Sequence, residues 1–337
     1  MTTNCHASRA RGPRTTITLI AVLLLMDGLR AGSAVVQAQT PIGSTEIVFV
    51  RKTSATTWGM FRRDVRTGAE ARLLSSAYPC PTRDLSTIAY CAYRDPVVSP
   101  DGRRVAFVVE VTPKGDANTR VDNVWIAALD GANALQITGA RRTAAPAWSP
   151  DGRRLAYEEY GVIYEVPLCN NSFPERRPGT VARGASPSYS KDGKWIAYSR
   201  DGAVYRITPG ASSETILTGN LGRFVETEPR WIRTGWGGNE YVVFLSNNMT
   251  SGSTQLPSNV RAQAVGAASP STYQVTKTDT RKSSPDIAAD WYGTKFVWEE
   301  AGRIWYRDDK TPSAGVPLTR GTTPSFGVFA ARVATCP

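Results

Sequence analysis

Hydrophobic and polar positions alternate along most of the chain in short runs separated by turn residues. The clearest runs flank a Ser-Pro-Asp-Gly or Ser-Lys-Asp-Gly phrase that occurs three times, at 99–102, 149–152 and 190–193. Serine and proline suit the first two positions of a type I turn, aspartate tolerates the third, and glycine accepts a positive φ. Each phrase therefore predicts a hairpin of two antiparallel strands with one buried face.

Two further segments follow each hairpin. The third segment is aromatic and lies at 124–126, 162–164 and 204–207, and the fourth is short, ends in Thr or Gly, and lies at 135–138, 180–184 and 215–219. Four short strands in each unit are typical of a β-propeller blade. The spacing of about 40 to 50 residues between units also favours a repeat architecture.

The number of units can be counted from the prolines that open them. These are Pro96, Pro146, Pro187, Pro229, Pro285 and Pro324. Six openings predict an all-β, six-bladed propeller of four-stranded antiparallel blades. The wider spacings are assigned to loops at 110–122 and 246–259, and 77–95 is expected to be an irregular connector.

The first unit lacks its own first strand. Segments 46–50, 59–65 and 71–74 match the second, third and fourth strands of a unit, whereas 323–326 matches the first-strand segment 186–189. We therefore expect the C-terminal strand to join the N-terminal blade and close the ring, which leaves no free sheet edge at either end.

The repeated phrase resembles the repeat of the TolB-type β-propellers. It reads Pro-x-aromatic-Ser-Pro-Asp-Gly-x-x-aliphatic-Ala-aromatic, and a fourth strand that closes in Leu-Thr completes the unit. The resemblance covers nearly all of the chain after residue 38 and implies a periplasmic or secreted propeller that presents a surface to partner proteins. TolB has an α/β domain before its propeller, for which residues 39–44 leave no room, so its contact residues are not transferred to this chain.

The N-terminal residues resemble a secretory signal. Three arginines in the first 14 residues precede an apolar run at 17–26, and Val-Gln-Ala at 36–38 offers small residues for cleavage near Ala38. The apolar run is too short for a membrane span. We expect 1–38 to be a signal peptide, 39–337 to be the propeller domain, and the mature protein to lie in the periplasm or outside the cell.

The cysteines after the signal are even in number, which fits disulfides in an exported chain. They are Cys80, Cys91, Cys169 and Cys336. Because Cys80 and Cys91 lie in one connector, we expect them to pair, which leaves Cys169 to pair with Cys336. No Cys-x₂-Cys spacing occurs, so neither a metal nor a cofactor is expected.

The single histidine of the chain, His6, lies in the signal region, and the whole chain carries a net charge of +11. A Ser-His-Asp or Cys-His site needs an imidazole, and zinc and non-haem iron sites usually have histidine ligands. The mature chain therefore offers no catalytic site of these kinds. Nucleic acid is not expected as a partner either, because the chain is exported and no recognised nucleic-acid module occurs.

The connectors between the fourth strand of one unit and the first strand of the next should line one face of the ring. They carry more basic than acidic residues: Arg141, Arg142, Arg183, Arg223, Lys277, Arg281, Lys282 and Arg320 against Glu226, Glu228 and Asp279. One interpretation is a solvated rim, and the other is a face that attracts an acidic protein segment or a polyanionic glycan. Trp236, in a replaced turn, is a further binding candidate.

Carboxylates and aromatic residues also recur in the repeats. Turn formation already explains Asp101, Asp151 and Asp192, and packing between blades explains Trp148, Tyr189, Trp231 and Phe326. We therefore interpret the protein as a monomeric, non-enzymatic propeller that binds a protein or polyanionic partner. The alternative is a glycan lyase or hydrolase with a carboxylate, Tyr and Arg site at the centre, for which Glu158, Glu159, Glu299 and Glu300 are the candidate carboxylates.

Overall fold

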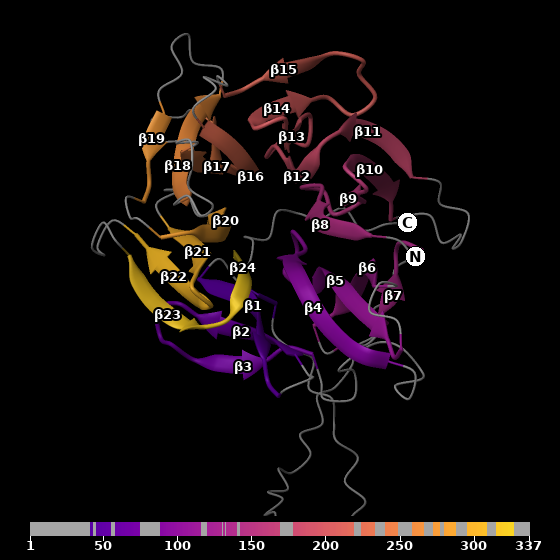
Figure 1. The fold of residues 1–337 in the computed structure, drawn as a ribbon, viewed down its shortest axis with the longest axis vertical. Helices are drawn as coiled ribbons and strands as arrows, with labels where there is room; N and C mark the ends of the chain where they lie inside the picture. The colour runs from indigo at the N-terminus through magenta and orange to yellow at the C-terminus, as the bar shows by residue number, and fades with distance from the viewer. Residues whose placement is uncertain are drawn as a thin grey trace, which may run out of the picture. The chain divides into compact units, whose positions relative to one another are not determined.

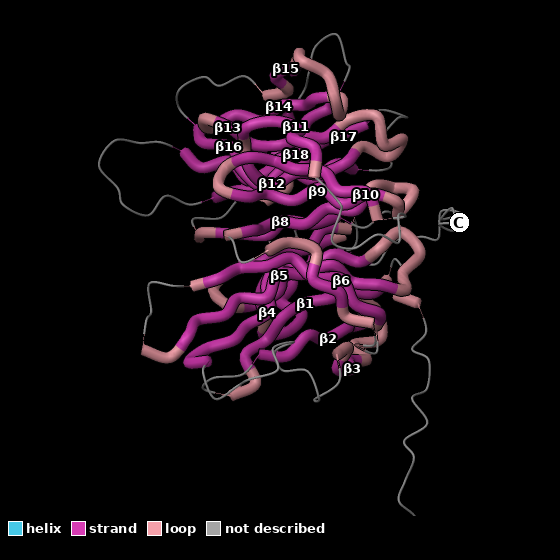
Figure 2. The backbone as a smooth tube through the Cα atoms, turned by 90° about the vertical axis from the view of Figure 1, so that its right-hand side faces the viewer, coloured by secondary structure: helices cyan, strands magenta, loops and turns pink. Residues whose placement is uncertain are grey.

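The protein is a six-bladed β-propeller. The structure is a computed structural model and describes residues 41–42, 45–54, 58–74, 88–115, 120–129, 131, 133–139, 142–168, 178–218, 224–232, 240–248, 258–265, 272–276, 280–287, 295–308 and 315–326. Within these ranges the chain forms strands and loops and no helix (Figure 1, Figure 2). No helix in the described part could therefore span a membrane.

Each of the first three blades is a four-stranded antiparallel sheet. Its strands follow one another along the chain from the centre outward, except that the inner strand of blade 1 comes from the C-terminal end of the chain. Blade 1 contains β24 (Thr322–Phe326), β1 (Glu46–Lys52), β2 (Trp58–Asp64) and β3 (Glu70–Arg72). Blade 2 contains β4 (Ile88–Val98), β5 (Arg104–Pro113), β6 (Val121–Ala128) and β7 (Leu135–Gln136). Blade 3 contains β8 (Thr143–Trp148), β9 (Arg154–Glu159), β10 (Val162–Pro167) and β11 (Gly179–Arg183).

The other three blades have the same strand order. Blade 4 contains β12 (Ala185–Tyr189), β13 (Ile196–Arg200), β14 (Ala203–Ile207) and β15 (Glu214–Ile216). Blade 5 contains β16 (Phe224–Ile232), β17 (Glu240–Asn248), β18 (Ser258–Val265) and β19 (Thr272–Gln274). Blade 6 contains β20 (Lys282–Ile287), β21 (Phe296–Glu300), β22 (Arg303–Arg307) and β23 (Val316–Arg320).

The C-terminal strand closes the ring, as the repeat pattern predicts. β24 pairs antiparallel with β1, with Phe326 opposite Ile47 and Thr322 opposite Val50. The first strands of successive blades contact one another in a complete circuit, from β24 through β4, β8, β12, β16 and β20 back to β24 (Figure 1). Each blade thus has two neighbouring blades, and the chain ends leave no inner strand missing.

Two blades are longer than the sequence pattern predicts. In blade 2, β4 begins at Ile88, inside the segment expected to be an irregular connector, and Cys91 pairs with Val111. The reason is that the apolar run of β5 continues past Glu110, so the hairpin extends into the expected loop. In blade 5, β17 and β18 likewise extend to Asn248 and Ser258.

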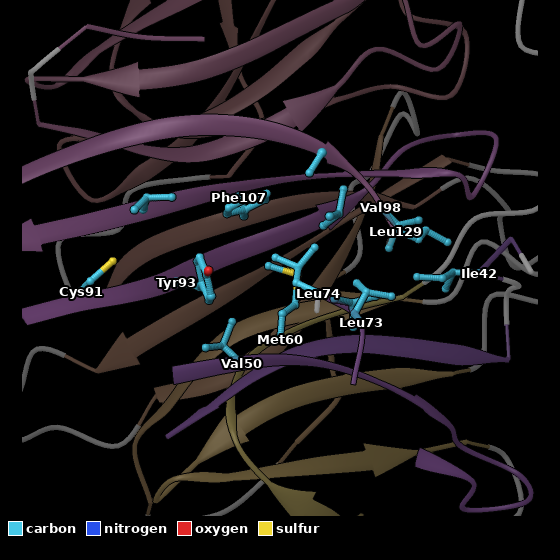
Figure 3. Packing of buried hydrophobic residues seen from close by; sticks show 14 residues of the cluster. Ile42, Val50, Met60, Leu73, Leu74, Cys91, Tyr93, Val98, Phe107 and Leu129 are labelled. Atoms are coloured by element: carbon cyan, nitrogen blue, oxygen red, sulfur yellow. The ribbon is translucent and has the colours of Figure 1, made fainter. Parts of the chain in front are cut away.

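The hydrophobic core lies between the blades. A separate cluster of buried side chains fills each of the six spaces between neighbouring sheets of the described part. Between blades 1 and 2, Val50 and Met60 face Tyr93 and Phe107, and Ile42 joins the same cluster (Figure 3). The recurrent aromatic residues of the first strands are buried in these spaces, as expected: Trp148, Tyr189, Trp231 and Phe326.

The Ser-x-Asp-Gly turns are satisfied by their own hydrogen bonds. In blade 3, Ser149 Oγ donates to Asp151 Oδ1 over 2.5 Å and accepts a bond of 2.9 Å from the Arg154 N–H. The same Asp151 oxygen accepts from the Arg153 N–H at 3.0 Å. Blades 2 and 4 repeat this arrangement. The turn aspartates therefore have local structural partners.

The threonines that end the fourth strands also have a structural role. Their hydroxyl oxygens accept a backbone N–H of the third strand at 2.9 Å in blades 2, 4 and 5, through the pairs Thr138–Val124, Thr218–Val204 and Thr276–Val260. A buried N–H without a partner costs about 1–3 kcal/mol, so this bond accounts for the threonine in the repeat.

Candidate partner-binding face

The propeller has two faces of different construction. The turn face carries the hairpins between first and second strands and the turns between third and fourth strands. The connector face carries the turns between second and third strands, together with the connectors from one blade to the next. These two parts of the connector face are joined by backbone bonds, from Gly184 N to Gly161 O at 2.8 Å and from Gly321 N to Gly302 O at 3.1 Å.

A β-bulge interrupts the first strand near the connector face. In five described blades the residue before the opening proline has a positive φ: Asp95 (49°), Ala145 (47°), Ser186 (55°), Glu228 (52°) and Thr323 (46°). The strand register shifts at the same places. A bulge leaves a backbone N–H outside the ladder, so that group needs another acceptor.

Carboxylates from the preceding blade accept three of these N–H groups. Asp95 Oδ2 accepts from Ala145 N at 3.5 Å, Glu158 Oε2 from Ser186 N at 3.3 Å, and Glu299 Oε2 from Thr323 N at 3.4 Å. Each of these weak bonds connects one blade to the next. The structure thus gives Glu158 and Glu299, at equivalent positions of β9 and β21, the same structural role.

The Asp95 carboxylate lies close enough to repel two carboxylates of other blades, Glu158 and Glu299. Burial raises the pKa of Glu158 and that of Glu299 above the usual value, and the charge of Asp95 raises both further. Asp95, Glu158 and Glu299 belong to blades 2, 3 and 6, and only the inner strands around the ring centre bring these blades together. The charge of Arg94 acts in the opposite direction and lowers the pKa of Glu158.

The candidate catalytic carboxylates are the last two residues of β9 and of β21. Glu300 accepts a bond of 3.0 Å from the Trp298 indole N–H, and Glu159 is buried. The hydrogen bonds of Glu158, Glu299 and Glu300 account for these side chains without a substrate. Within the described residues no group of histidine, cysteine or acidic side chains could hold a metal ion.

The connector face also carries exposed basic side chains. Four arginines of the connectors are exposed: Arg142, Arg183, Arg281 and Arg320. Within the part of the chain that the structure describes, no ion pair joins any of these four guanidinium groups to a carboxylate.

Lys282 does not lie on this exposed rim. Its side chain is fully buried, with Nζ 3.7 Å from Glu300 Oε2, and it donates to the Thr280 carbonyl oxygen at 3.1 Å. The sequence pattern placed Lys282 in an exposed connector, but it is the first residue of β20 and its side chain points into the protein. An ammonium that is already neutralised inside the fold cannot contact a partner at the surface.

Several predicted site residues lie outside the described residues. These are Arg141, Trp236, Arg223, Lys277 and Asp279, together with Cys80, Cys169, Cys336 and the whole of 1–38. Cys91 is described and is 8 % exposed in β4. The signal peptide and both disulfide pairings therefore stay predictions.

Blade 5 contains buried polar atoms without a hydrogen-bond partner among the described residues. They are Glu226 Oε2, Ser246 Oγ and Arg261 Nε, all from neighbouring strands on one side of the sheet. Burial raises the pKa of Glu226 above its usual value, because desolvation outweighs the hydrogen bond from Thr218 and the charge of Arg261. Buried polar atoms in this part of the connector face therefore have fewer hydrogen bonds within the described residues than the Ser-x-Asp-Gly turns of the opposite face.

Sequence reasoning missed the exposed aromatic residue Tyr160. It occupies the first position of the two-residue turn between β9 and β10, with φ 51°, and is 69 % exposed. The equivalent turns of blades 4 and 6 have Asp201 and Ala301 at this position, each also with a positive φ and followed by glycine. Alignment of the three turns would have singled out the tyrosine.

The comparisons with known proteins agree with the fold. No family model matches the chain. TolB from Acinetobacter baumannii superposes with a TM-score of 0.58 at 17 % identity, over 84 % of this chain and 67 % of that one. A putative TolB from Agrobacterium tumefaciens has a TM-score of 0.51 at 16 % identity, over 84 % of this chain and 93 % of that one. The fold is thus that of the TolB propellers, and at these identities the likeness shows the fold alone.

A curated protein matches only a small part of the chain. The uncharacterized peptidase YuxL of Bacillus subtilis is 38 % identical over 71 residues, which are 20 % of this chain and 10 % of the peptidase. The match spans about a tenth of the peptidase's length and is about the size of one or two blades.

Proposed function

We propose that this protein is an exported, monomeric, non-enzymatic propeller that binds an acidic segment of a partner protein on its connector face. The observation that carries the proposal is the set of four exposed arginines, none of which is ion-paired within the described residues. The TolB-like fold supports a binding function, since such a ring presents a broad face built from loops.

Charge on this face should act mainly on the rate of association. Exposed charges at the rim of an interface steer the encounter and are screened by salt over about 8 Å at physiological ionic strength. A polyanionic glycan carries the same negative charge, and it differs from an acidic protein in resisting protease treatment.

The test compares charge reversal on the two faces. The double variant Arg142→Glu, Arg183→Glu changes the connector face, and Arg103→Glu changes an exposed arginine of a turn on the opposite face. Immobilised wild-type and variant proteins are incubated with envelope extract at low and high salt, and the retained proteins are identified by mass spectrometry. We expect a salt-sensitive protein that the double variant loses and Arg103→Glu retains.

Other outcomes contradict the proposal. Capture that survives both high salt and the double variant rules out recognition by these arginines, and capture that survives protease treatment identifies a glycan. Turnover of a glycan by the purified protein, abolished by Glu158→Gln or Glu299→Gln, would show the enzymatic alternative instead. Export is tested by N-terminal sequencing of the extracellular or periplasmic protein, which should begin near Gln39.

A further inference from the structure

Three exposed residues form a row along the connector edge of blade 3. Arg142 directly precedes β8, Tyr160 lies in the turn between β9 and β10, and Arg183 ends β11. The pairing of Thr143 with Glu159 places Arg142 beside the turn, and the bond from Gly184 N to Gly161 O places Arg183 on its other side. All three side chains are exposed.

The fold does not need a tyrosine at this turn. A positive φ at the first position of a two-residue hairpin favours Asn, Asp or Gly, and a bulky residue there is strained. Tyr160 is also among the most exposed large hydrophobic residues of the described chain, at 69 %, so burial cannot offset this strain. Backbone strain at an exposed aromatic residue is a reason to look for a binding role.

The row has the composition of a binding hot spot. Tyrosine and arginine are enriched among the residues that contribute most to protein interfaces, because a rigid ring and a guanidinium group bury large areas and make specific bonds. Neither Arg142 nor Arg183 has an ion-pair partner among the described residues. Along the backbone, Arg142 and Arg183 lie on opposite sides of the turn that carries Tyr160.

We propose that Tyr160 is the anchor for an extended acidic peptide segment of the partner, in which a large apolar side chain packs on the ring and carboxylates on either side bind Arg142 and Arg183. This proposal rests on the proposed function and names the chemistry of its partner. The first and fourth strands of a blade are three strand spacings apart, about 14 Å. An extended segment of about four residues covers that distance.

The probe is a set of fluorescein-labelled synthetic peptides of about eight residues, twice the span of the row. The first peptide has two aspartates on each side of a leucine, the second has alanine in place of the leucine, and the third has lysines in place of the aspartates. Binding to the full-length protein is measured by fluorescence anisotropy at low ionic strength. We expect the first peptide to bind tightest and the third not to bind.

The informative variant is Tyr160→Asn, since asparagine accepts the positive φ and should keep or raise the thermal stability. Ala301→Asn makes the same change in the equivalent turn of blade 6 and is the matched control. We expect Tyr160→Asn to weaken binding of the leucine peptide about tenfold or more and to abolish its preference over the alanine peptide. Ala301→Asn should change neither.

The outcomes separate this proposal from the proposed function. One outcome supports the basic face and overturns the tyrosine anchor. In it the leucine peptide binds, the double variant Arg142→Glu, Arg183→Glu removes the binding, and Tyr160→Asn has no effect. If neither variant affects binding, or no acidic peptide binds, both proposals are overturned. Loss of binding with Ala301→Asn as well would show a general effect of the turn substitution and would also overturn the anchor.

Discussion

The pKa values of carboxylates shift in opposite directions on the turn face and on the connector face. On the turn face, burial alone would raise the pKa of Asp151, but hydrogen bonds from Ser149 and the Arg153 N–H outweigh it and lower that pKa. The pKa of Asp192 and that of Asp64 are lowered through the same balance. On the connector face, burial prevails, and the pKa values of Glu158, Glu226 and Glu299 are raised.

The difference arises because the two faces form their hydrogen bonds in different ways. The turn face is built from one local phrase in which a serine and an aspartate satisfy each other and the backbone. On the connector face, backbone N–H groups at the bulges donate to carboxylates of the preceding blade. Polar atoms of blade 5 have no hydrogen-bond partner among the described residues. The first arrangement is local to one turn, whereas the second depends on contacts between blades.

The largest expected effect comes from matched glycines of blade 2. Gly102 on the turn face has φ 69°, and a Cβ there would lie 2.6 Å from the Ile42 carbonyl oxygen. Gly115 on the connector face has φ 87°, and among the described residues no atom lies within 4 Å of a Cβ built there. Both alanine variants should lose about 1 kcal/mol of unfolding free energy to the positive φ. Gly102→Ala should lose about 2 kcal/mol more, because buried Ile42 must be displaced.

Urea denaturation of the two glycine variants measures this difference. Equal losses in both variants would mean that the contact of 41–42 with the turn contributes nothing, and the turn face would then be no more tightly built than the connector face.

A smaller difference is expected from two buried serines. Ser149→Ala removes a hydroxyl that bonds to Asp151 and to the Arg154 N–H, and should lower the unfolding free energy by about 1–3 kcal/mol. Ser246→Ala removes a buried hydroxyl that has no hydrogen-bond partner among the described residues, and its effect should stay within about 0.5 kcal/mol of zero. Thermal and urea unfolding of both variants provide the measurement, and a costly Ser246→Ala would reveal a partner for its hydroxyl.

The turn face was predictable from sequence because its interactions are local. Ser149, Pro150, Asp151 and Gly152 specify a turn without reference to the rest of the chain, and three copies of the phrase established the blade. Ring closure was also predictable, since one strand was missing at one end of the chain and present at the other.

The connector face was predictable only in part because its contacts join residues far apart in sequence. Nothing near Lys282 in the sequence indicates that its ammonium faces Glu300, and so it was placed on the exposed rim. The approach of Glu158 and Glu299 to Asp95 likewise exists only once the ring closes. Tyr160 could have been found, but only by comparing equivalent turns position by position.

The smallest expected effect, and the most direct test of the comparison, is the pH dependence of stability. The pKa of Glu226 in the folded protein is raised, so its contribution to stability is present below the unfolded value of 4.5 and is lost as the pH rises through the folded pKa. The pKa of Asp151 is lowered, so its contribution is present above 3.8 and is lost as the pH falls through the folded pKa.

Two isosteric variants isolate these contributions. Relative to wild type, Glu226→Gln should become more stable as the pH rises from about 4.5 toward neutral, because the variant does not bury a charge. Asp151→Asn should become more stable relative to wild type as the pH falls below about 4, because the turn carboxylate of the wild type is then protonated. Urea unfolding at about pH 3, 5 and 7 gives both trends, and the shared titration of all other groups cancels in each difference. Trends of the same sign in the two variants would show that folding shifts the pKa of both carboxylates in the same direction. The contrast between the carboxylates of the turn face and those of the connector face would then be wrong.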